Sequence, residues 1–90
     1  MPRYVIEREM EGIGDLTPEQ LREGSLRSLE ALGELGPKIQ WLCSYVTDNK
    51  LYCVYIAPDE ETIRRHADMI GVPANRISRV RRLLDPSNYV

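Results

Sequence analysis

Short stretches in which apolar and polar residues alternate predict four β-strands along the chain. These stretches fall at residues 3–9, 39–46, 51–56 and 77–84. Between them, residues 17–35 and 59–70 repeat apolar side chains at a spacing close to 3.6, which predicts two amphipathic helices. Each helix therefore has one apolar side that a sheet can cover.

Local end signals bound both helices. Thr17 precedes a proline and has Gln20 three residues later, which is a capping box, and Gly36 followed by proline ends that helix. Asp59 supplies the N-cap of the second helix, and Gly71 supplies its end. Both helices are thus defined by residues next to them in the sequence.

The second and third strands form a predicted hairpin. Asp48-Asn49 suits a two-residue turn that needs positive φ at both positions. If Thr47 pairs with Lys50, one face of the hairpin carries the pairs Cys43–Val54, Tyr45–Tyr52 and Trp41–Ile56. The other face then carries Leu42, Ser44 and Val46 beside Leu51, Cys53 and Tyr55.

The predicted order of elements is βαββαβ. Right-handed crossovers and short connections leave one common solution for this order. It is an α+β, ferredoxin-like sandwich, in which a four-stranded antiparallel sheet carries both helices on one face. Residues 1–90 are expected to form one such domain, with a core at about 2–86 and a loosely held tail at 87–90.

Both faces of the hairpin are apolar, although two helices cover only one face of this sheet. A stripe holding Tyr45, Tyr52 and Val54, or its counterpart on the other face, exceeds what a monomer normally exposes to water. We therefore expect a symmetric homodimer that packs sheet against sheet. The alternative is a monomer with a partly exposed aromatic face.

The composition of the chain limits the classes of partner that it is expected to bind. The 90 residues contain no apolar run near the roughly 18 residues of a spanning helix and begin without an apolar signal segment. We expect a cytoplasmic protein with no membrane partner.

RNA-recognition modules share the βαββαβ order, but the net charge of −2, the pI near 5.4 and the lack of phenylalanine argue against nucleic acid as a partner. No phosphate loop, metalloprotease motif or nucleophile elbow occurs, so no catalytic residue is assigned.

Histidine and cysteine are the first candidate metal ligands. His66 is the only histidine, and it lies on the flank of the apolar stripe of the second helix. This position suits a metal ligand, an acid–base group or an amphipathic edge residue. Cys43 and Cys53 fall on opposite faces of the hairpin, so they cannot jointly bind one metal within a subunit. Cys53 is interpreted as a small buried hydrophobe, and Cys43 as a soft donor on the other surface.

Glu7 is an acid in an otherwise apolar strand. A charge that faces a sheet surface usually needs a partner, and Arg79 or Arg81 of the adjacent last strand would supply one. Its carboxylate could instead supply an oxygen to a divalent cation.

Four segments carry a family resemblance: residues 2–9 (PRYVIERE), 39–48 (IQWLCSYVTD), 52–60 (YCVYIAPDE) and 65–67 (RHA). Over about residues 2–86 the chain resembles a small nickel-binding ferredoxin-like family of bacteria, frequent in actinobacteria and otherwise known as a domain of unknown function. The resemblance implies a dimer, in some members with an extra short strand, and surface nickel sites associated with metal sequestration. It also implies that His66 is a ligand.

The resulting hypothesis is a non-enzymatic homodimer that binds a divalent metal, nickel, through His66 with help from Glu7 or Cys43. With one histidine per chain, a site with several histidines needs a second subunit. One alternative is a small dimeric α+β-barrel enzyme, of the monooxygenase or isomerase kind, with an organic substrate in a cavity between sheet and helices. The other is an interaction module whose open sheet face docks a different protein.

Overall fold

The computed structural model describes residues 1–89, and position 90, the last residue of the expected loose tail, lies outside the described residues. The elements follow the predicted βαββαβ order, with two short 3₁₀ helices added. Their bounds are β1 (Arg3–Glu9), η1 (Ile13–Asp15), α1 (Pro18–Leu35), β2 (Gln40–Val46), β3 (Lys50–Ile56), α2 (Glu60–Ile70), β4 (Arg76–Arg79) and η2 (Pro86–Tyr89).

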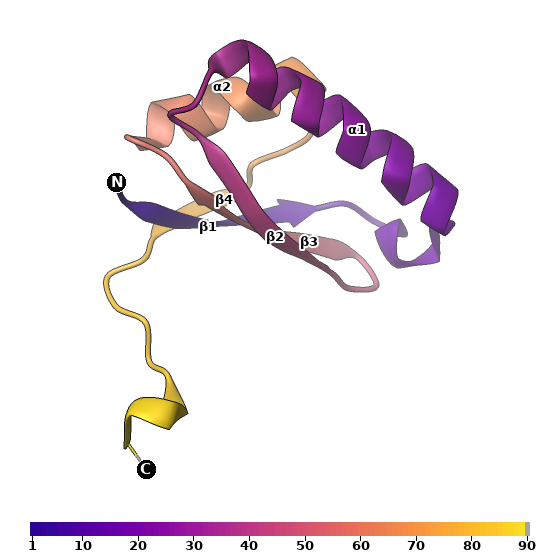
Figure 1. Cartoon of the computed structure of the whole chain (residues 1–90). Coiled ribbons are helices and arrows are strands. Elements are labelled where there is room, and N and C mark those ends of the chain that lie inside the picture. Colours follow the sequence, from indigo (N-terminus) through magenta and orange to yellow (C-terminus); the bar gives the residue numbers. More distant parts are fainter. Residues whose placement is uncertain (90) are drawn as a thin grey trace.

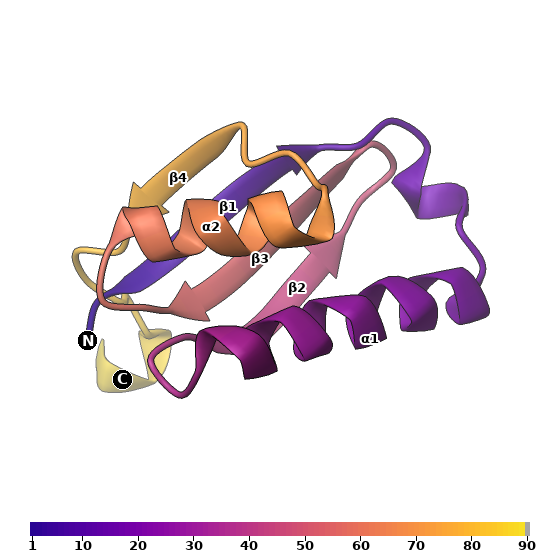
Figure 2. The ribbon, with the colours of Figure 1, turned by 90° about the horizontal axis from the view of Figure 1, so that it is seen from above.

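The four strands form one antiparallel sheet in the order β2-β3-β1-β4. Both helices lie on the same side of this sheet (Figure 1). Figure 2 shows α2 lying over β1 and β3, with α1 along the β2 side of the sheet. The predicted ferredoxin-like α+β fold is confirmed, and within residues 1–89 neither α-helix lies on the opposite side of the sheet.

The predicted helix ends are confirmed. Thr17 Oγ1 accepts a hydrogen bond from Gln20 N at 3.2 Å, and Gln20 Oε1 accepts one from Thr17 N at 3.0 Å, which completes the capping box. Asp59 accepts from the first turn of α2. Gly36 and Gly71 end α1 and α2 with φ of 87° and 70°, a backbone region that glycine enters without steric cost.

The hairpin turn differs from the expectation, because no non-glycine residue among 1–89 has a positive φ. Instead, Lys50 N donates to Thr47 Oγ1 at 3.1 Å, and Thr47 N donates to Lys50 O at 2.9 Å. The turn also packs against η1, where Gly14 N donates to Asp48 O at 3.0 Å. A Cβ on Gly14 would lie 2.8 Å from Asp48 Cα and from the carbonyl oxygen of Thr47, so this close approach requires glycine.

The predicted hairpin register holds at two pairs, Cys43–Val54 and Tyr45–Tyr52. It fails at Trp41, which lies opposite Tyr55 rather than Ile56, because a β-bulge follows it in β2. The extra residue in the bulge is Leu42. The bulge moves the indole of Trp41 from the open side of the sheet to the helix side, where it packs against the core.

The last strand is shorter than predicted. It spans Arg76–Arg79, and Val80 N makes the last hydrogen bond to β1, to the Arg3 carbonyl at 2.8 Å. Because β1 begins at Arg3, the chain beyond this point has no strand to pair with. Residues 81–89 form an extended C-terminal arm that leaves the body on the side of the sheet away from the helices (Figure 1).

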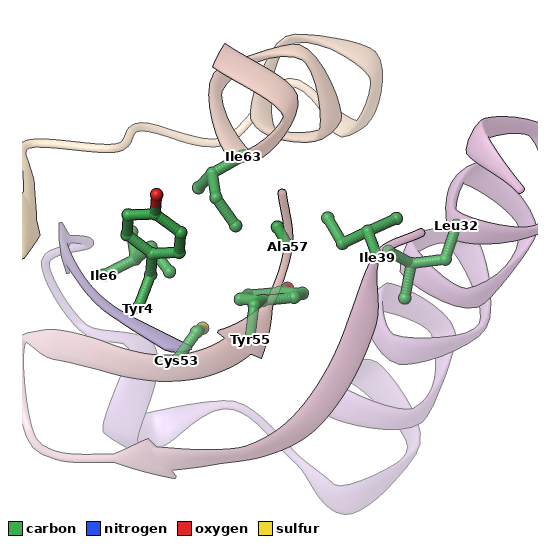
Figure 3. Close-up of a cluster of buried hydrophobic side chains, with 8 residues drawn as sticks. All are labelled: Tyr4, Ile6, Leu32, Ile39, Cys53, Tyr55, Ala57 and Ile63. Carbon is green, nitrogen blue, oxygen red and sulfur yellow. The ribbon is translucent and has the colours of Figure 1, made fainter. Parts of the chain in front are cut away.

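The core lies between the sheet and the two helices (Figure 3). Its buried apolar residues are Tyr4, Ile6, Leu32, Ile39, Cys53, Tyr55, Ala57 and Ile63. Along β1, Tyr4, Ile6 and Arg8 alternate inward, so a charged residue occupies the third inward position of the strand. This placement of Arg8 within the buried layer is the least expected feature of the core.

Candidate functional site

The side of the sheet away from the helices, here called the open face, is largely apolar and uncovered. Strand alternation and register assign its central residues, which are Val5, Glu7, Cys43, Tyr45, Tyr52, Val54 and Ile56. Tyr45 is 64% exposed, and Cys43 is exposed as well. Two of the three predicted ligands, Glu7 and Cys43, therefore share this face.

Glu7 is paired with an arginine, but not with either arginine that the sequence suggested. The register of β1 and β4 places Arg76 opposite Glu7, with Arg76 Nε 3.8 Å from Glu7 Oε2. Arg79 lies opposite Tyr4 instead, and Arg81 follows the end of the strand. Because the Arg76 side chain is 76% exposed, water weakens this ion pair, and the carboxylate keeps its capacity to bind other cations.

The two cysteines lie on opposite faces of the sheet, as predicted. Cys53 is buried under the helices, and Cys43 is exposed on the open face. Glu7 is level with Tyr45 across two strand spacings, and Cys43 lies two residues further along β2. With strands about 4.8 Å apart and residues about 3.4 Å apart, the Cα atoms of Glu7 and Cys43 are roughly 12 Å apart.

A single subunit therefore does not bring Glu7 and Cys43 to one ion. Side chains of a strand stand roughly perpendicular to the sheet, so the two side chains and metal–ligand bonds of about 2 Å do not bridge this separation. Among residues 1–89, no group of three or more histidine, cysteine, aspartate or glutamate residues is placed to hold a metal ion. The residues of one subunit consequently do not fit a complete nickel site.

His66 is buried in the core rather than at the edge of α2. It has no exposed surface, and its Nε2 lies 3.1 Å from Ser28 Oγ and 3.3 Å from the Ser28 carbonyl oxygen, both on α1. Its ring also faces Tyr55 of β3, with the ring centroids 5.4 Å apart. The edge interpretation failed because the packing of α2 on α1, which the sequence does not show, turns this flank inward. The sheet separates His66 from Glu7 and Cys43.

The hydrogen bonds of His66 define its neutral form. Because a carbonyl oxygen only accepts, the Nε2 atom carries the proton that it donates to Ser28. Nδ1 is buried and has no hydrogen-bond partner in the described part of the chain. Burial lowers the pKa of His66 below its usual value, and the nearby Arg8 charge lowers it further, while the bond to Ser28 opposes this change.

Arg8 is the residue that the sequence interpretation missed. It is 1% exposed, and its Nη1 donates to the Pro73 carbonyl oxygen at 2.8 Å. Among the 89 described residues its Nη2 has no hydrogen-bond partner. It lines a cavity of about 310 Å³ between α1 and the sheet. The alternation of Tyr4, Ile6 and Arg8 along the first strand was the signal that could have identified it.

The fold and the open face define a small ferredoxin-like α+β protein that lacks an assembled metal centre within residues 1–89 of one subunit. A family model described as nickel responsive protein SCO4226-like matches residues 4–80. The chain belongs to this SCO4226-like family, which agrees with the resemblance noted in its sequence.

Among solved structures, the chain is similar to the crystal structure of SCO4226 from Streptomyces coelicolor A3(2). The match has a TM-score of 0.75 at 19% sequence identity, and it covers 91% of this chain and 99% of the other. At this identity the likeness establishes a shared fold. Comparison with curated proteins gives no match. Within residues 1–89, no helix has the length and apolar character needed to cross a membrane.

Proposed function

We propose that this protein is a non-enzymatic homodimer that binds Ni²⁺ between two open faces and acts in metal sequestration or homeostasis. The description of its family as nickel responsive supports a role connected with nickel. The observation that carries the proposal is the uncovered apolar open face, which also presents a carboxylate and a thiol. A cytoplasmic location stays a prediction.

The occupant that we propose for the open face is a second copy of the chain. Tyr45 is the most exposed of its aromatic residues. The C-terminal arm extends on the same side of the sheet and exposes 71% of Leu83 and 79% of Leu84 (Figure 1). In a face-to-face dimer, these leucines would pack against the partner subunit, so one arrangement covers both the face and the arm.

A two-fold axis between the subunits would also bring the two candidate ligands, Glu7 and Cys43, close together across the interface. An axis midway between Glu7 and Cys43 sets the Cys43 thiol of one subunit over Glu7 of the partner subunit. Nickel accepts oxygen and sulfur donors, and thiolate binding releases a proton. His66 is not included, because it lies behind the sheet and its Nε2 is bound to Ser28.

Calorimetric titration of the untagged protein with Ni²⁺ tests this assignment. Glu7→Gln and Cys43→Ser are expected to weaken binding by about tenfold or more each, since each removes an anionic ligand. Glu61→Gln, a change to an exposed acid of α2, is the matched control and should bind as the wild type does. Loss of binding in His66→Gln, with full binding in Glu7→Gln and Cys43→Ser, would contradict the proposal and restore the histidine site.

The enzyme alternative requires a cavity between the sheet and the helices with His66 in its wall, and the structure has the cavity without the histidine. The core is not solid, since a cavity of about 310 Å³ lies between α1 and the sheet. Its lining residues do not include His66, which lies behind two of them, Ser28 and Tyr55. A binding role for this cavity is therefore better supported than an acid–base reaction at His66.

A further inference from the structure

The guanidinium of Arg8 is a buried positive charge without an acidic partner in residues 1–89. The two ion pairs in this part of the chain join Arg64 to Glu60 and Arg76 to Glu7. Arg8 Nη1 donates to the Pro73 carbonyl oxygen, and its Nη2 has no hydrogen-bond partner within residues 1–89. Burying an unpaired charge is costly, so a protein that keeps one usually provides an anion for it.

The cavity that Arg8 lines has the size and the walls of a site for a small organic molecule. Its volume of about 310 Å³ lies within the usual range for ligand pockets, roughly 300–1,000 Å³. Leu21 of α1, Leu51 of β3 and Ile70 of α2 provide apolar walls. Because Arg8 itself is 1% exposed, little water screens its charge, which strengthens any interaction between a bound anion and its guanidinium.

The polar groups of the cavity favour a negative ligand. Arg27 of α1 lines it as a second cation, and no aspartate or glutamate is among its lining residues in the described chain. Ser28 and Tyr55, which each carry a hydroxyl group, also line it. Burial raises the pKa of Tyr55, so this phenol stays protonated and is a hydrogen-bond donor.

We propose that this cavity binds a small organic acid, with one carboxylate on the Arg8 guanidinium and an apolar chain or ring against Leu21 and Leu51. The guanidinium offers its unpartnered Nη2 to the carboxylate, and the Tyr55 hydroxyl provides a further donor. The site lies on the helix side of the sheet, so it is separate from the open face and does not depend on a bound metal.

Trp41 provides a direct readout, because it is the only tryptophan and lines the same cavity. Its Nε1 donates to Ser44 Oγ at 2.9 Å, within the cavity wall. The probe is octanoate, titrated in the presence of EDTA, and 1-octanol is the neutral probe with the same chain. We expect a saturable change in Trp41 fluorescence, with octanoate bound about tenfold or more tightly than octanol because of the charge-assisted pair.

Two arginine variants assign that preference to one side chain. Arg8→Met keeps an unbranched side chain that fills part of the same space and removes the charge, and it should bind octanoate and octanol equally. Arg22→Met changes an exposed arginine of α1 that does not line the cavity, and it should keep the wild-type preference. Failure of octanoate to bind, equal binding of both probes by the wild type, or a preference retained in Arg8→Met would each overturn the proposal.

If Arg8→Met does not fold, the wild-type comparison of octanoate with octanol decides the question. Because EDTA is present throughout, the outcome is independent of nickel binding. A negative result with octanoate therefore leaves the metal proposal in place, and failure of nickel to bind the open face leaves this one in place.

Discussion

The single histidine should make the stability of the protein depend on pH in a narrow, identifiable range. His66 is fully buried and donates from Nε2 to Ser28, and residues 1–89 offer no hydrogen-bond partner to its Nδ1. Burial disfavours the charged imidazolium, and the nearby Arg8 charge disfavours it further, so the folded pKa lies below the usual 6.5 although the bond to Ser28 opposes this change. The unfolded chain therefore takes up a proton at a higher pH than the folded protein does.

The sign and the limit of this effect follow from proton binding. Where the unfolded chain binds more protons, stability increases with pH. The contribution of neutral His66 is thus complete above pH 6.5 and is lost as the pH falls from 6.5 toward the lowered folded value. One proton limits the slope of the unfolding free energy to about 1.4 kcal/mol per pH unit. Asp59 and Asp85 also have lowered pKa values, but they titrate below 3.8, outside this range.

Urea unfolding between about pH 5.5 and 7.5, followed by Trp41 fluorescence, measures this slope. In His66→Gln the side-chain amide can still donate to the Ser28 carbonyl oxygen, but it does not titrate. We expect a loss of stability below pH 6.5 in the wild type and a nearly flat profile in the variant. A wild-type profile that is flat below pH 6.5, or the same slope in His66→Gln, would refute the reasoning.

Three further predictions concern the fold and the dimer. Gly14→Ala should lower the unfolding free energy by about 1–3 kcal/mol, measured by denaturant titration, because the new Cβ would lie 2.8 Å from backbone atoms of the hairpin turn. Gly33→Ala, on an exposed turn of α1 with nothing within 4 Å, should instead raise it by about 0.5–1 kcal/mol. A loss of stability in both would contradict the assigned contact. Replacing Leu83 and Leu84 together by serine should shift the mass in light scattering from dimer toward monomer with an unchanged circular dichroism spectrum, and an unchanged dimer mass would count against the role of the arm.

The features that sequence predicted well are those governed by neighbouring residues. Thr17 and Gln20 form a capping box with each other, and Asp59 and Gly71 bound α2 through local backbone geometry. The βαββαβ order followed from these boundaries, and the family resemblance came from runs of adjacent residues. Such signals do not depend on how the elements later pack.

The features that sequence missed depend on contacts between distant segments. The bulge at Leu42 and the resulting inward position of Trp41 depend on pairing with β3, and the early end of β4 depends on where β1 begins. His66 is buried because α2 packs against α1 with this side of the helix facing inward. The rotation of α2 about its own axis depends on both helices and is not specified by the sequence of α2 alone. Arg8 was overlooked because hydrophobic patterning expects no charge at an inward position, although the alternation of β1 places it there.

The position of bound Ni²⁺ tests the central claim most directly, and paramagnetic broadening of backbone amide resonances measures it. Added to the untagged, isotopically labelled protein, Ni²⁺ should broaden the amides of Glu7, Cys43 and Val54, which share the open face. The amides of α2 around His66, on the other side of the sheet, should stay sharp. Broadening centred on His66, or no broadening at all, would contradict a metal site between two open faces.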